Sequence, residues 1–211
     1  MWALVTDNTI TKIINNPKGL VIDNIRYSRN IFSFRWSNEE REAKGIYEVV
    51  FNNTNKKDEA YYTNTNQSFA FADGVVTASY GSATAKAHAD TLWTQADSDD
   101  GDLPSDKSVG DVKVEGLKTV RIRTLKSQAG GILAQTDWYI VRKADANTAV
   151  PSAITTHRAA VRTKCAEMET AITNASNTAA IETLYTYVNT ADEGDPVVME
   201  RPLGNLPELE V

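Results

Sequence analysis

Two neighbouring stretches, "TDWYIVRK" at residues 136–143 and "VPSAITTHRAAVR" at residues 150–162, decide the fold of the C-terminal half. A helical pattern ends just before the first stretch. Pro151 suits the first position of the next helix, because its missing N–H would be unpaired there anyway. Arg158 and Arg162 are one turn apart on this second helix and share a face. The two stretches therefore predict the joint of a helical hairpin.

Aromatic and cationic side chains are concentrated at this joint. The chain is expected to turn at residues 136–137. Trp138 and Tyr139 then fold back onto the helices, and Trp138 fills the joint. We predict a structural joint or contact surface made by five residues: Trp138, Tyr139, Arg142, Arg158 and Arg162.

Apolar residues at helical spacing indicate the flanking helices. Residues 114–135 form one such pattern. Its two glycines, Gly130 and Gly131, each cost a helix about 1 kcal/mol relative to alanine, which a helix tolerates when another backbone packs closely against it. The next helix has an apolar stripe made by Ile154, His157, Val161, Cys165, Met168 and Ile172. Asn177 caps a last short helix, whose apolar residues are Ile181, Leu184, Tyr185 and Val188.

The remaining C-terminal segments differ in composition. Residues 82–96, "SATAKAHADTLWTQA", are rich in alanine and predict a further helix. Residues 97–111 form an acidic loop with glycine and proline. Residues 191–211 hold three of the six prolines and predict an extended tail.

Strand signals dominate residues 1–81. "WALV" and "TITKII" flank Asp7 and Asn8 at a spacing typical of a hairpin. "IYEVVF", residues 46–51, is the most strand-like stretch, and Asp73-Gly74 predicts a tight turn between two more strands. "IFSFRW", residues 31–36, alternates apolar and polar residues and is interpreted as part of the β-rich region.

A short helix interrupts these strands, with Ser37 as its N-cap and Gly45 at its C-terminal end. The predicted fold class is α+β. We expect a small, mostly antiparallel β-rich docking domain at residues 1–81 and a helical hairpin or bundle at residues 82–190. The extended tail at residues 191–211 completes the chain.

Composition disfavours several classes of protein. The formal net charge of −6 is unsuited to non-specific nucleic-acid binding, which needs a basic surface. The basic run Lys118, Arg121, Arg123 and Lys126 has no interleaved aromatic residues, so we interpret it as a solvated helix face. No apolar run approaches the ~20 residues of a membrane span, and the N-terminus has no signal-peptide pattern. We therefore expect neither a nucleic-acid nor a membrane partner.

Residues suited to catalysis are few. The two histidines are His88, on the alanine-rich stretch, and His157, on the apolar stripe, where each is most simply explained by packing or exposure. Cys165 is two helical turns from His157, about 12 Å away, which is too far for a nucleophile and its base. We predict no catalytic residues and no enzyme activity.

The acidic loop does not have the spacing of a calcium-binding loop. Counted from Asp97, Gly101 is fifth and Ser108 is twelfth, whereas a calcium loop needs glycine sixth and glutamate twelfth. The register fails, and a solvated acidic loop is the simpler interpretation. Phosphate-binding loops and zinc-type cysteine pairs are absent from the sequence. We predict no metal and no cofactor.

The opening stretches also resemble a known pattern. Phage tail proteins, tail fibre assembly chaperones among them, have a C-terminal segment with T-D-W, then R, then proline, then Y-R-x-x-L-R. The matching residues here are Thr136, Asp137, Trp138, Arg142, Pro151, Arg158 and Arg162. His157 and Val161 stand where that pattern has tyrosine and leucine. The N-terminal half, with "NNPKG", "GIYEVVF" and "ADGVVTASYG", looks like tail-fibre-like or virion proteins of marine phages.

The resemblance implies a phage origin and a role in the tail, and it implies no catalytic residues. The expected function is that of a non-enzymatic virion structural protein of the tail fibre, adaptor or baseplate. Such a protein would be made in the host cytoplasm, assemble as a homo-oligomer and contact other tail or fibre proteins. One alternative is a tail fibre assembly chaperone that is absent from the mature particle. Another is a host-directed depolymerase, which would need paired carboxylates in a cleft and is disfavoured.

Overall fold

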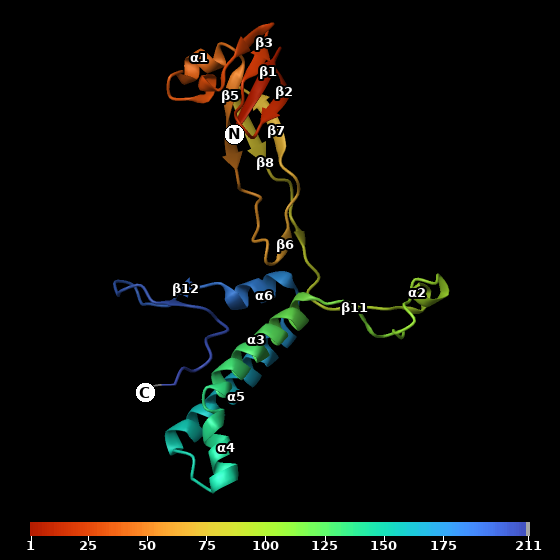
Figure 1. The fold of residues 1–211 in the computed structure, drawn as a ribbon, viewed down its shortest axis with the longest axis vertical. Coiled ribbons are helices and arrows are strands. Elements are labelled where there is room, and N and C mark those ends of the chain that lie inside the picture. Colours follow the sequence, from red (N-terminus) through yellow and green to blue (C-terminus); the bar gives the residue numbers. More distant parts are fainter. Residues whose placement is uncertain (210–211) are drawn as a thin grey trace. The chain divides into compact units, whose positions relative to one another are not determined.

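The computed structural model describes residues 1–209, and the chain divides into two compact units, Met1–Thr84 and the residues from Ala85 onward. The first unit is β-rich and the second is built around helices (Figure 1). Each unit has its own hydrophobic core. The protein is therefore α+β, as the sequence predicts.

The N-terminal hairpin is confirmed. Strands β1 (Trp2–Thr6) and β2 (Thr9–Ile14) pair in antiparallel register. Asp7 and Asn8 between them have φ of 50° and 57°. Two consecutive left-handed residues form the tight turn whose twist matches that of a hairpin, and Asp and Asn tolerate this conformation better than other residues with a side chain.

The main sheet has five strands in the order β2-β1-β5-β8-β7. The three further strands are β5 (Ile46–Asn52), β7 (Ser68–Ala72) and β8 (Val75–Ser79). The predicted Asp73-Gly74 turn joins β7 to β8, and this hairpin places β8 beside β5 in parallel register. The other neighbouring pairs are antiparallel, and the edge strands β2 and β7 also touch, so the sheet curls into a half-barrel. Its core is formed by Ala3, Val5, Val49, Val76 and Ala78.

Residues 31–36 lie in the β-rich unit, but their alternation of apolar and polar residues does not form a strand. A 3-10 helix, η1 (Arg29–Phe32), and a turn occupy this segment. The reason is Arg41, which is 8% exposed and donates to the carbonyls of Ser33 (3.1 Å) and Trp36 (2.7 Å). These carbonyls are therefore directed at a buried guanidinium rather than at a neighbouring strand.

The short helix is confirmed as α1 (Asn38–Glu42). The Ser37 hydroxyl accepts from the Glu40 N–H, and the Glu40 carboxylate accepts from the Ser37 N–H, which is a capping box. Gly45 has φ of +74°, and a Cβ there would lie 2.4 Å from the Val5 carbonyl oxygen. Only glycine fits this approach to the sheet.

Smaller hairpins complete the β-rich unit. Strands β3 (Leu20–Ile22) and β4 (Ile25–Tyr27) pair across a left-handed Asp23-Asn24 turn. Strand β6 (Tyr62–Thr63) pairs with β9 (Thr84–Ala85), where the unit ends. The β3–β4 hairpin was not predicted, although its Asp-Asn turn repeats that of β1–β2.

Four helices form the body of the second unit (Figure 1): α3 (Leu117–Ala134), α4 (Asp137–Ala146), α5 (Ser152–Asn174) and α6 (Thr178–Tyr185). Helices α3 and α5 pack along each other, and Leu125, Met168, Ile172 and Leu203 form their shared core. The predicted stripe of α5 is confirmed, with its residues buried except for the half-buried Cys165. No helix within residues 1–209 is long and apolar enough to cross a membrane.

The predicted helix at residues 82–96 is wrong. This segment holds β9, β10 (Thr91–Leu92) and only the start of a short helix, α2 (Gln95–Asp99). Its backbone caps α3 instead: the carbonyls of Ala87 and His88 accept from the first N–H groups of that helix. The Asp90 carboxylate accepts from the Gly116 N–H at 2.7 Å and from the Thr119 hydroxyl at 2.8 Å. These long-range bonds outweigh the helix propensity of alanine.

Residues 91–114 form an arm in which β10 pairs with β11 (Val112–Val114) and α2 lies between the two strands. The Asp97 carboxylate caps α2 by accepting from the Thr94 N–H and hydroxyl, and it also pairs with Lys113. The Lys113 ammonium lies 4.4 Å from the centre of the Trp93 ring. The acidic loop is thus partly organised by one of its own carboxylates.

The C-terminal segment returns to the helical core. Asn177 caps α6, as predicted, but Val188 lies in a strand, β12 (Val188–Asn189), rather than in the helix. β12 pairs with β13 (Met199–Glu200), and the chain then runs back along α3 and α5. Leu203 is 3% exposed in the core of that pair. Residues 201–206 are therefore a packed part of the unit, and not only an extended tail.

Candidate interaction surface at the α3–α4–α5 junction

Arg158 of α5 holds the junction between α3 and α4. Its Nη1 donates to the Leu133 carbonyl at 2.6 Å and to the Thr136 hydroxyl at 2.7 Å, and lies 2.8 Å from a carboxylate oxygen of Asp137. The Arg158 side chain is 9% exposed, and Thr136 is buried. A buried guanidinium is tolerated only when it is paired and hydrogen-bonded, so these three partners fix where α4 begins relative to α5.

Trp138 does not fill this joint, contrary to the sequence interpretation. The predicted turn at residues 136–137 is only the start of α4, and Trp138 on its first turn is 52% exposed. The interior position at the joint is taken by Arg158. The sequence pattern places Arg158 on the correct face but does not indicate this role.

An aromatic and cationic cluster lies on α4 instead. The rings of Trp138 and Tyr139 have centroids 4.0 Å apart at an interplanar angle of 35°. The Arg142 guanidinium carbon lies 4.5 Å from the Trp138 centroid and 5.4 Å from that of Tyr139. Cation–π contacts of this kind hold the three side chains together on the helix surface. The structure thus brings together three of the five predicted residues.

Arg162 stands apart from this cluster. It is exposed, and its Nη1 makes a long hydrogen bond of 3.4 Å to the Arg158 carbonyl one turn earlier in α5. The two arginines are one turn apart, as expected, but Arg158 lies at the buried joint and Arg162 lies at the surface.

Helix α4 exposes apolar side chains that the rest of its unit does not cover. None of its ten residues, all of which the structure describes, is buried. Trp138, Ile140 and Val141 are 52%, 43% and 64% exposed. A ten-residue helix is marginal on its own in water, because helix nucleation is unfavourable. The junction with Arg158 and the Trp138–Tyr139–Arg142 contacts are interactions that stabilise α4 within the described chain.

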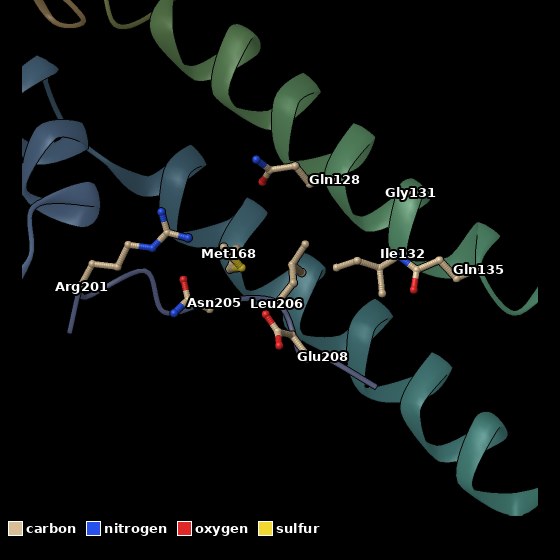
Figure 2. A pocket seen from close by; sticks show the side chains of 9 residues that line it. All are labelled: Gln128, Gly131, Ile132, Gln135, Met168, Arg201, Asn205, Leu206 and Glu208. Carbon is tan, nitrogen blue, oxygen red and sulfur yellow. The ribbon is translucent and has the colours of Figure 1, made fainter. Parts of the chain in front are cut away.

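A groove of about 520 Å³ lies between α3 and the returning C-terminal segment (Figure 2). Leu206 packs against the helical core at this groove. The polar residues that line the groove are the amides Gln128, Gln135 and Asn205, one cation, Arg201, and one anion, Glu208. Gly131 also lines it. Beyond their own helix, no described atom lies within 4 Å of a Cβ built at Gly130 or Gly131, so no other backbone packs closely against these glycines.

The basic run of α3 is engaged within the unit rather than simply solvated. The Lys118 ammonium donates to the Thr173 carbonyl at 2.7 Å, and the Lys126 ammonium lies 2.7 Å from a carboxylate oxygen of Glu169. Both contacts join α3 to α5. The guanidinium carbon of Arg121 lies 4.8 Å from the centre of the Tyr185 ring. Arg123 pairs with Glu115.

Metal-ligating side chains do not form a cluster in the described part of the chain. Within residues 1–209 no group of three or more His, Cys, Asp or Glu side chains could hold a metal ion. Burial, with a smaller contribution from Glu169, raises the pKa of the Cys165 thiol, which disfavours the reactive thiolate. His157 is buried on the stripe, as predicted. Hydrogen bonds from Lys113 and then Thr94 lower the pKa of Asp97 to about 2.

Comparison with known proteins returns no match: no protein-family model fits the chain, and neither a curated protein nor a solved structure matches it significantly.

Proposed function

We propose that this protein is a non-enzymatic structural component of a phage tail that acts by docking and by oligomeric assembly. The tail assignment rests on the sequence pattern at residues 136–162. The assembly assignment is supported by the surface that the chain exposes.

Exposed area is the observation that carries the assembly proposal. A compact monomer of 23.2 kDa exposes roughly 9,700 Å². Two separate compact bodies with the lengths of the two units would expose roughly 11,600 Å² together. The chain exposes 14,038 Å². Even relative to two separate compact bodies, the excess exposed area is about three times the ~800 Å² that each partner buries in a standard interface.

Many large apolar side chains are exposed on this surface, which favours contact with other proteins. Large apolar side chains are at least 40% exposed on α4, on the strands of both units and in the C-terminal hairpin. Exposed apolar groups gathered on one element mark a site of protein contact more often than a solvated face. The expected partners are further copies of this chain and other tail or fibre proteins.

Mass spectrometry of gradient-banded particles from an infected culture tests the tail assignment. Peptides of this protein should be present at a small integer ratio to an established tail component, and the ratio gives the copy number. A host protein of similar abundance in the lysate serves as the control for contamination. Absence from particles, with abundance in the lysate, contradicts the structural role and supports the alternative of an assembly chaperone.

A further inference from the structure

The C-terminal hairpin, residues 187–200, exposes a group of large apolar side chains. Its two strands, β12 and β13, pair only with each other within residues 1–209. Five large apolar residues on it are between 45% and 70% exposed: Tyr187, Val188, Val197, Val198 and Met199. An isolated two-stranded hairpin is marginal in water, and its unpaired edges can add to another chain.

The same hairpin is strongly acidic. Residues 187–200 contain Asp192, Glu193, Asp195 and Glu200 and no lysine or arginine. This segment therefore accounts for four of the six net negative charges of the chain. A partner surface should combine apolar groups with positive charge.

Helix α4 has this combination. It exposes Trp138, Ile140 and Val141 and carries Arg142 and Lys143. The carboxylate of Asp137 is neutralised by its ion pair with Arg158. Asp145 is the other acidic residue of this helix, and it forms no such ion pair among the described residues.

The hairpin and α4 of one molecule lie at opposite ends of α5 (Figure 1). Helix α4 precedes the start of α5 at Ser152, and the hairpin follows its end at Asn174 and the short α6. A helix of 23 residues is about 35 Å long. The two complementary surfaces therefore do not meet within one chain.

We propose that the β12–β13 hairpin of one copy docks on helix α4 of a second copy. This inference rests on the proposed oligomeric assembly and names the surface through which it occurs. The two sides of this contact are different surfaces, and each copy has one hairpin and one α4 surface. The contact is therefore head-to-tail. Such contacts close into a ring or continue as a filament, and both arrangements suit a repeated component of a particle.

Mixing two variants of the full-length chain tests the head-to-tail contact. Val197→Glu blocks the hairpin and Val141→Glu blocks α4, and both valines are more than 60% exposed, so neither change should disturb the fold. Val21→Glu, at a 59% exposed position of the β3–β4 hairpin, is the matched control. Each protein is measured by size-exclusion chromatography with light scattering, and its fold is checked by circular dichroism.

The expected result is that the wild type and Val21→Glu form the same oligomer, whereas Val197→Glu and Val141→Glu are each monomeric. An equimolar mixture of the two monomeric variants should form dimers and nothing larger, because one intact hairpin and one intact α4 surface remain in that pair. Covalent dimers between Val197→Cys and Val141→Cys copies, both in a Cys165→Ala background, provide a second readout.

The outcomes separate this inference from the proposed function. If Val197→Glu or Val141→Glu assembles like the wild type, the hairpin–α4 contact is wrong while oligomeric assembly stands. If both variants are monomeric but their mixture does not form dimers, the contact is not head-to-tail and the inference is wrong. A wild-type protein that stays monomeric at all concentrations overturns both the contact and the assembly proposal.

Discussion

The guanidinium of Arg158 lies 2.8 Å from the carboxylate of Asp137, and this pair joins the long helix α5 to the first residue of α4. The same nitrogen also binds the Leu133 carbonyl and the Thr136 hydroxyl. One buried cation thus fixes the direction in which α4 leaves the helical pair, and with it the position of the exposed Trp138 cluster.

Removing this cation should destabilise the helical unit. Arg158→Met keeps an apolar stem but leaves the Leu133 and Thr136 acceptors without their donor, and we expect a loss of about 2–3 kcal/mol in the free energy of unfolding. Urea denaturation followed by circular dichroism measures it. Arg162→Met, on the exposed side of the same helix, should change the free energy by no more than about 0.5 kcal/mol. Equal effects of the two substitutions would show that the junction does not depend on Arg158.

Trp138→Ala should have a small effect on folding and a larger one on assembly. The ring is half-exposed, so we expect to lose its stacking and cation–π contacts, about 1 kcal/mol, rather than the 3–5 kcal/mol of a buried tryptophan. Thermal denaturation measures the first effect and light scattering the second. A fall in stability of core size would mean that Trp138 is packed inside the unit after all.

Two glycines in and next to α3 should respond to alanine in opposite ways. At Gly116 a Cβ would lie 2.3 Å from the Ala89 carbonyl carbon, so Gly116→Ala must push two backbone segments apart and should cost roughly 1–3 kcal/mol. At Gly130 no described atom lies within 4 Å of a Cβ, and alanine is the better helix former, so Gly130→Ala should stabilise by about 1 kcal/mol. Chemical denaturation of both variants beside the wild type measures the difference. A destabilising Gly130→Ala would reveal close packing at that face.

Asp97 should titrate far below an ordinary aspartate. Its pKa is lowered to about 2 by hydrogen bonds from Lys113 and Thr94. A lowered pKa means that the carboxylate stabilises the folded arm above the unfolded pKa of about 3.9, and that this contribution is lost as the pH falls through about 2. Carbon-13 NMR of the carboxyl groups between pH 5 and pH 1.5 measures it.

Lys113→Met should raise the pKa of Asp97 toward its ordinary value of 3.8, because the first of these hydrogen bonds is then lost. Lys107→Met, elsewhere in the same arm, is the control and should leave the titration unchanged. An Asp97 that titrates near 3.8 in the wild type would mean that the Lys113 contact does not form in solution.

The elements that the sequence predicted well depend on interactions between near neighbours in the chain. The Asp-Asn and Asp-Gly turns, the Ser37 N-cap and the apolar stripe of α5 are each specified by residues close together in the chain. Turn residues, caps and helical periodicity act at this range, so they can be identified from the amino acids alone. The candidate residues of the joint were found in the same way, from the aromatic pair Trp138-Tyr139 and the three arginines near it.

Long-range hydrogen bonds and packing decided the features that the sequence analysis missed. Residues 82–96 have the composition of a helix, yet Ala87 and His88 cap α3 instead, because α3 needs acceptors for its first N–H groups. Trp138 is exposed because Arg158, from a helix that starts later in the chain, occupies the joint. The amino acids thus determined which local elements form, and only the tertiary structure decided which surfaces they cover, because burial depends on partners distant in sequence.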